Sequence, residues 1–190
     1  MLEAISFGDA GWGDEMLMGA FWTVAVSISS ILLGLVIGII LAGFKLSSIR
    51  VLNLIAEFYT TIIRGVPELL VIYLLFFGGG SAVMYVAKIF GYFGYIELQP
   101  FVIGTLAVGA ISGAYSTEVI RGAVNAIPRS QFETGSALGL KGFRLYQKII
   151  FPQVARLALP GIGNVWQITL KDTALISVTG LVEIMRQSRI

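Results

Sequence analysis

The stretch AFWTVAVSISSILLGLVIGIILAGF, residues 20 to 44, contains no charged side chain. As an α-helix rising about 1.5 Å per residue it reaches about 37 Å, and a bilayer has a hydrocarbon core of about 30 Å. The run is too long for the apolar region of a cleavable signal peptide, and the segment before it is acidic instead of basic: Glu3, Asp9, Asp14 and Glu15. This stretch therefore predicts a helix that spans a membrane and stays there.

The composition of the whole chain agrees with that prediction. Hydrophobic residues make up 56% and charged residues 13%, whereas soluble domains have about 25% charged residues. The 190 residues contain no Cys and no His, which excludes disulfides and thiolate metal sites and removes the commonest general base and metal ligand. We predict no catalytic residue and no metal site, and the net charge of +2 is too small to indicate nucleic acid binding.

We expect an all-α, polytopic transmembrane bundle that forms a single domain over residues 1 to 190, with four spans at residues 20 to 44, 55 to 78, 98 to 120 and 155 to 181. Lys45 and Arg50 directly follow the first span, so the positive-inside rule places the N-terminus outside. After two more crossings, residues 121 to 156 lie inside. This segment carries one acidic residue, Glu133, against six basic ones, which agrees with the rule: Arg121, Arg129, Lys141, Arg144, Lys148 and Arg156.

Glycine residues recur within the spans and in one connection between them. Gly34 with Gly38, and Gly109 with Gly113, have the spacing that lets membrane helices approach closely, although glycine is common in membrane spans and either pair alone is weak evidence. Residues 76 to 100 contain three consecutive glycines, residues 78 to 80, and many aromatic side chains. We interpret them as an external, partly helical connection at the membrane interface.

A second stretch, FETGSALGLKGFRLYQKIIFP (residues 132 to 152), is basic and polar within an apolar chain. Pro128 ends the segment before it, and Ser130 with Glu133 forms a capping-box pattern that predicts a helix from Gln131. Gly139 stands where a left-handed C-terminal cap would fall, and Gly142 permits a second bend. A second short helix then ends at Pro152. The pattern predicts two short cytoplasmic helices joined by a glycine elbow, which either another protein grips or lipid headgroups cover.

This stretch resembles the E-A-A loop in the membrane subunits of binding-protein-dependent ABC importers, because Glu133, Gly139, Ile149 and Pro152 have the spacing of that loop. Thr134 and Gly135 stand where the family usually has two alanines, and Phe151 where Leu is usual. Residues 60 to 70, 113 to 139 and 158 to 181 resemble the polar amino-acid, histidine permease-type branch of the family. Together these stretches cover most of the chain after residue 50.

The resemblance implies a MetI-like permease fold in the cell inner membrane. Members of that family usually carry a fifth span beyond the point that corresponds to residue 190, and this sequence does not include it. It implies that residues 128 to 152 form a coupling loop whose docking residues are Glu133, Gly135, Ser136, Ala137, Gly139 and Pro152. The implied partners are two ATPase subunits, a second identical or homologous permease subunit, and an extracytoplasmic solute-binding protein. Such a subunit moves polar amino acids or their derivatives by alternating access.

The sequence contains no phosphate-binding loop of the form G-x-x-x-x-G-K-[ST]. We therefore expect that the chain is not an enzyme, holds no cofactor, and depends on a partner that binds ATP. Two other classes remain as alternatives. An ion-coupled secondary transporter usually shows more spans and internal repeats, and a channel shows a filter or a ring of charges.

Charged residues within spans cost about 2.5 to 3.5 kcal/mol each at mid-depth, so they tend to face a cavity or a partner. We therefore assign four such residues to a translocation path: Arg64, Glu118, Lys171 and Asp172. Glu68 is a further candidate. Arg64 could instead bind lipid phosphate at the interface, and Glu118 could pair locally with Arg121. The polar residues after Lys171 predict a broken last span, unless that span simply ends at Lys171. The sequence does not identify the solute, and opines fit as well as amino acids.

Overall fold

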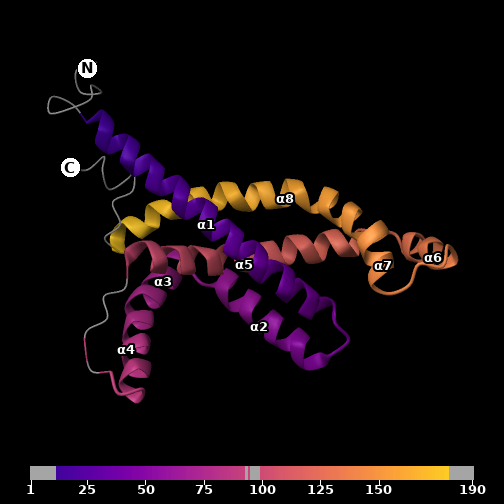
Figure 1. Ribbon diagram of the computed structural model, residues 1–190, viewed down its shortest axis with the longest axis horizontal. Helices are drawn as coiled ribbons and strands as arrows, with labels where there is room; N and C mark the ends of the chain where they lie inside the picture. The colour runs from indigo at the N-terminus through magenta and orange to yellow at the C-terminus, as the bar shows by residue number, and fades with distance from the viewer. Residues whose placement is uncertain (1–11, 93, 95–98, 180–190) are drawn as a thin grey trace.

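The structure is a computed structural model that describes residues 12–92, 94 and 99–179 (Figure 1). Within these residues the elements are helices and no strand occurs. Three helices are long and apolar enough to cross a membrane: α1 (Gly13–Leu46), a continuous helical segment over Glu68–Tyr85, and α5 (Pro100–Asn125). The prediction of an all-α membrane-spanning fold is confirmed.

α1 and α5 pack against each other more extensively than any other pair of described helices. A Cβ atom at Gly34 would lie 1.9 Å from Ser112 Oγ, and one at Gly113 would lie 2.8 Å from Ile37 Cγ2. Gly38 and Gly109 are equally tight, with side-chain atoms of the opposite helix at 2.7 Å. Both predicted glycine pairs therefore lie at one helix–helix interface, where the missing side chains allow the backbones to approach.

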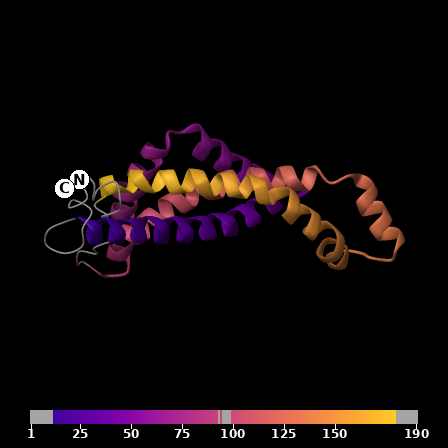
Figure 2. The ribbon, with the colours of Figure 1, turned by 90° about the horizontal axis from the view of Figure 1, so that it is seen from above.

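The main core lies where α1, α3 (Glu68–Tyr73), α5 and η4 (Thr173–Thr179) meet. Its buried members are Val26, Val71, Ile72, Ala107, Val108, Ile111 and Ile176. α8 (Phe151–Asp172) runs beside α1 and α5 (Figures 1 and 2), and Trp166 Nε1 donates a hydrogen bond to Ser27 Oγ at 3.0 Å. These contacts hold the C-terminal end of α8 close to the start of α3.

The prediction of one span over residues 55 to 78 is wrong, because two helices share that range. α2 (Arg50–Gly65) ends before Val66 and Pro67, which are both extended. Proline has no N–H to donate and disfavours the α conformation of the residue before it. A new helix then runs through α3, the π-helical turn η2 (Leu74–Gly78) and α4 (Gly79–Ile89). The three consecutive glycines therefore lie in a helix and not in a loop, and α4 points away from the long axis of the bundle (Figure 1).

The prediction that Pro152 ends a helix is also wrong. A π-helical turn, η3 (Tyr146–Ile150), leads directly into α8, and Pro152 lies in the first turn of α8. A missing N–H is tolerated in a first turn, since the first N–H groups of a helix have no partner within it. α8 is not among the helices apolar enough to span by composition. It changes to the 3₁₀ helix η4 after Asp172, where the break was predicted, and the end of the predicted fourth span, from residue 180, lies outside the described residues.

Candidate functional sites

The predicted glycine elbow exists, and we use "the elbow" for α6 (Arg129–Ala137), α7 (Phe143–Leu145), η3 and the residues between them. Gly139 has φ +79° and Gly142 has φ +53°, which confirms both predicted bends. The N–H of Gly139 donates to Ser136 O at 3.0 Å, and the N–H of Leu140 donates to Gly135 O at 3.1 Å. This pair of hydrogen bonds is a Schellman motif, in which glycine takes the left-handed position.

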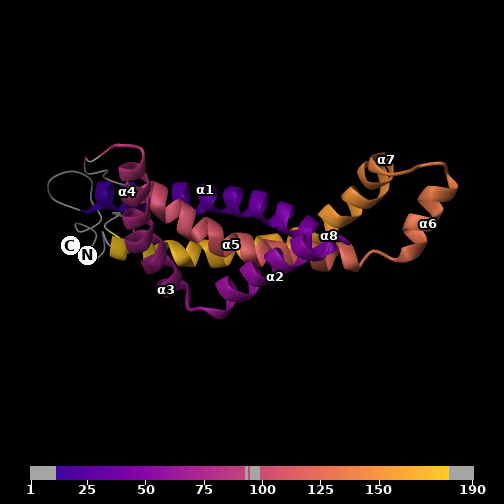
Figure 3. The same ribbon diagram turned by 90° about the horizontal axis from the view of Figure 1, so that it is seen from below.

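A small core lies within the elbow and where it meets the end of α5 and the start of α8. Ile127, Leu145 and Ile150 are buried there, and four partly buried residues pack around them: Phe132, Leu140, Ile149 and Val154. Gln153 Nε2 on α8 donates to Gln131 Oε1 on α6 at 3.2 Å. Figures 2 and 3 show that the elbow lies at one end of the molecule, beyond the end of α5. The elbow is therefore a compact unit attached to α5 on one side and to α8 on the other.

The predicted docking residues of the elbow fall into two groups. Glu133, Ser136, Ala137 and Gly139 are exposed. Gly135 is buried, and a Cβ atom there would lie 2.2 Å from Leu145 Cδ1 and 2.8 Å from Ile149 Cδ1. Its assignment to the docking face is wrong, because it lets α6 pack against α7. Pro152 is exposed but belongs to α8.

The predicted capping box at the start of α6 is wrong too. The helix begins at Arg129 with Pro128 at the N-cap position, and no side chain makes a capping hydrogen bond. Ser130 lies inside the first turn. Sequence reasoning also missed Leu138 as an exposed apolar residue of the elbow; it is 73% exposed, close to Phe143 at 78%. The only sequence signal was their position beside Gly139 and Gly142.

A network of ion pairs joins the ends of α1, α2 and α5 around Glu118. Lys45 Nζ pairs with Glu57 Oε2 at 2.7 Å and with Glu118 Oε1. Arg121 donates to Glu118 Oε2 from Nη2 at 2.7 Å and from Nε at 3.0 Å, so the predicted local pair is present. The Lys45 side chain is only 3% exposed. Its burial was missed, since in the sequence it is simply the first charge after a span.

A second polar cluster joins α2, α3, α5 and the end of α8. Tyr115 Oη donates to Glu68 Oε1 at 3.2 Å, and the Arg64 guanidinium lies 5.6 Å from the centroid of the Tyr115 ring. Asp172 is 5% exposed, and its carboxyl lies beside that of Glu68. We call Glu68 and Asp172 the acidic pair.

The four residues predicted for the translocation path are only partly brought together. Asp172 belongs to the acidic pair, whereas Arg64 lies over Tyr115, which bonds to Glu68. Arg64 Nη1 also lies 3.9 Å from Glu118 Oε1. Lys171 is exposed, and in the part of the chain that the structure describes it forms no ion pair. The sequence could not show that Glu68 and Tyr115 complete this cluster, because its members are far apart along the chain.

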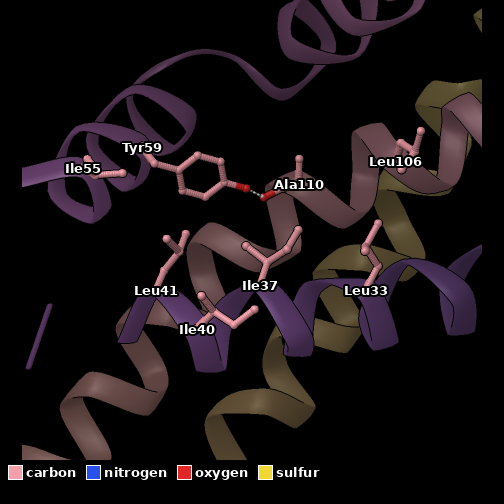
Figure 4. Close-up of a pocket in the computed structure, with 8 residues that line it drawn as sticks. All are labelled: Leu33, Ile37, Ile40, Leu41, Ile55, Tyr59, Leu106 and Ala110. Atoms are coloured by element: carbon pink, nitrogen blue, oxygen red, sulfur yellow. Dashed lines mark hydrogen bonds between the residues drawn. The ribbon is translucent and has the colours of Figure 1, made fainter. Parts of the chain in front are cut away.

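An apolar groove of about 480 Å³ lies between α1, α2 and α5 (Figure 4). Tyr59 Oη on its wall donates to Ala110 O at 2.7 Å and so is already satisfied. The other lining residues are Leu33, Ile37, Ile40, Leu41, Ile55 and Leu106. This groove offers no partner for an ammonium or carboxylate group, and within the described residues no cluster of side chains could hold a metal ion.

Comparisons with known proteins agree with the fold. A family model described as "Binding-protein-dependent transport system inner membrane component" matches residues 34–190. The chain is 52% identical to the nopaline transport system permease protein NocQ of Agrobacterium fabrum over 97% of this chain and 79% of that protein. It is 43% identical to the histidine/lysine/arginine/ornithine transport system permease protein HisQ of Escherichia coli, over 95% of this chain and 78% of that protein.

A solved structure is similar as well. The chain superposes with a TM-score of 0.78 and 28% identity on a structure described as an amino acid ABC transporter with histidines, covering 94% of this chain and 78% of that one. These findings support an importer permease and not an ion-coupled secondary transporter. The chain belongs to the family of binding-protein-dependent transport system inner membrane components, the membrane-spanning permease subunits of ABC importers.

Proposed function

We propose that this permease carries cationic amino acids or opines, and that their cationic groups pass the acidic pair. The observation that carries this proposal is the buried carboxyl of Asp172 beside Glu68, since within the described residues neither carboxyl forms an ion pair with a cation. A buried carboxylate without a cation is costly, and a solute with an ammonium or guanidinium group would offset that cost. Relatives named for nopaline, octopine and histidine/lysine/arginine/ornithine transport support the same class.

The remaining path residues receive distinct roles in this proposal. Arg64 lies across the Tyr115 ring from the acidic pair, and Glu118 lies at the cytoplasmic end of the path as a partner of Arg64. Lys171 is exposed in the single chain, and we expect it to face a second permease subunit. Arg64 is 44% exposed, which supports a second identical or homologous permease that completes the wall of the path.

We also propose that the elbow is the coupling element that docks to one of two ATPase subunits. Its exposed face offers Glu133, Ser136, Ala137, Leu138 and Phe143 to a partner. Its own core makes it rigid enough to move α5 and α8 together when the ATPases close. ATP then binds only to the partner, this chain holds no cofactor, the N-terminus is outside, and an extracytoplasmic binding protein delivers the solute.

The test is uptake by the complete importer in proteoliposomes with its binding protein and ATPase. We expect ATP-dependent uptake of labelled arginine, histidine or octopine, with competition among them and none from glutamate. Asp172→Asn should reduce the uptake of cationic solutes about 5- to 150-fold, since one buried unpaired group is worth about 1 to 3 kcal/mol. Transport of glutamate or of apolar amino acids in preference to cationic ones would contradict the proposed solute class.

A further inference from the structure

Arg64 lies between two groups of carboxylates. On one side Nη1 is 3.9 Å from Glu118 Oε1. On the other side the guanidinium lies over the ring of Tyr115, and the hydroxyl at the far end of that ring donates to Glu68 Oε1. One tyrosine side chain thus separates Arg64 from the acidic pair.

The charges on the two sides are unequal. Around Glu118, three cations (Lys45, Arg64 and Arg121) face two carboxylates (Glu57 and Glu118), so this network carries a net charge of +1. Glu118 Oε1 is already paired with Lys45, and Oε2 is paired with Arg121. Of the three ion pairs of Glu118, the one with Arg64 is therefore the longest and weakest. If Arg64 moved to the acidic pair, the network around Glu118 would become neutral and the acidic pair would gain a cation.

The backbone gives Arg64 room to make this move. It lies in the last turn of α2, and Val66 and Pro67 after it are extended, so no further helical turn confines its side chain. Gly65 has no atom within 4 Å of the position where a Cβ would stand. The guanidinium can slide over the face of Tyr115, a contact that retains cation–π attraction during the movement.

We propose that Arg64 is a movable counter-ion that competes with the cationic group of the solute for the acidic pair. This inference rests on the proposed role of that pair. With solute at Glu68 and Asp172, Arg64 stays between Tyr115 and Glu118, as in this structure. When the path opens to the cytoplasm, Arg64 moves to the acidic pair, displaces the solute and prevents its return. A tethered cation competes well because its effective concentration at the pair is high.

The test compares Arg64→Gln with wild type in the complete reconstituted importer. Without the competing cation the solute should leave more slowly, so KM and Vmax for arginine uptake should both fall, roughly fivefold or more. Labelled arginine retained by the detergent-purified complex should rise. Arg64→Lys should restore most of the Vmax, and Arg50→Gln, an exposed residue at the start of α2, should leave both parameters unchanged.

Glu118→Gln provides a second, opposite test that does not depend on the folding of the Arg64 variant. Removing that carboxylate should shift Arg64 toward the acidic pair and raise the KM. A raised KM for Arg64→Gln would mean that Arg64 binds the solute itself, and unchanged parameters in both variants would mean that it does not compete; either result overturns the inference. In both cases preferential uptake of arginine by wild type would still uphold the proposed solute class, which fails if wild type prefers glutamate or apolar amino acids.

Discussion

The interface between α1 and α5 and the elbow both depend on glycine, but for different physical reasons. At Gly34, Gly38 and Gly113 an added Cβ would collide with the opposite helix, while the helical backbone suits any residue. At Gly139 and Gly142 there is open space around the position of a Cβ, but the backbone has positive φ. The first kind of glycine determines whether the helices can pack. The second determines the direction in which the chain leaves a helix, and so the position of a surface that a partner must recognise.

The largest expected effect comes from filling the tight interface. Gly34→Leu places a Cβ only 1.9 Å from Ser112 Oγ. Over-packing of this kind costs about 1 to 3 kcal/mol or more. We expect loss of most of the protein from the membrane fraction in an immunoblot, together with loss of transport. The matched control is Gly43→Leu on the same helix, which has no neighbour within 4 Å and should accumulate normally. Normal accumulation of Gly34→Leu would contradict the packing role of this glycine.

An intermediate effect should follow from filling the core of the elbow. Gly135→Leu forces Leu145 and Ile149 away from α6, yet it leaves the α1–α5 interface untouched. We expect the variant to reach the membrane at a normal level, while uptake falls severalfold and a protease cuts residues 129 to 150 faster in inside-out vesicles. If transport and protease resistance both stay at wild-type values, α6 and α7 do not need to pack for function.

The smallest expected effect is that of Ser130→Ala. A serine in a working capping box contributes about 1 kcal/mol, but Pro128 holds the N-cap position and Ser130 makes no capping bond. The change in the free energy of unfolding should therefore stay within about 0.5 kcal/mol, as for most surface substitutions. Thermal unfolding of the purified complex measures it. A Tm lowered by several degrees would show that Ser130 does form the capping box that the sequence predicted.

The features predicted correctly depend on short sequence patterns. The apolar run of α1, the glycine spacing at the α1–α5 interface and the bends at Gly139 and Gly142 each follow from residues within one or two helical turns. Local patterns also misled: Ser130 and Glu133 have capping-box spacing, but Pro128 already starts the helix. Pro152 is a helix breaker in isolation, yet a π-helical turn before it lets the helix continue.

The polar clusters could not be predicted to the same degree, because their geometry comes from packing between distant segments. Arg64 and Asp172 were candidates because charge is rare in membrane spans, and that reasoning identified residue types without identifying partners. The pairing of Glu68 with Asp172 depends on how α8 lies against α3 and α5. The burial of Lys45 depends likewise on α2 folding back over the end of α1 to bring Glu57 to it.

Gly139→Asp tests most directly whether the elbow couples this permease to its ATPase. A residue other than glycine at φ +79° adds about 1 to 2 kcal/mol of backbone strain, which redirects the chain without disturbing the bundle. The matched control is Gly122→Asp, an exposed glycine of α5 with no neighbour within 4 Å. The measurement is the amount of ATPase that co-purifies with equal amounts of each permease, together with ATP-dependent uptake. We predict that Gly139→Asp loses most of the ATPase and of the uptake while Gly122→Asp retains both; wild-type ATPase binding and uptake by Gly139→Asp would show that the elbow is not the coupling element.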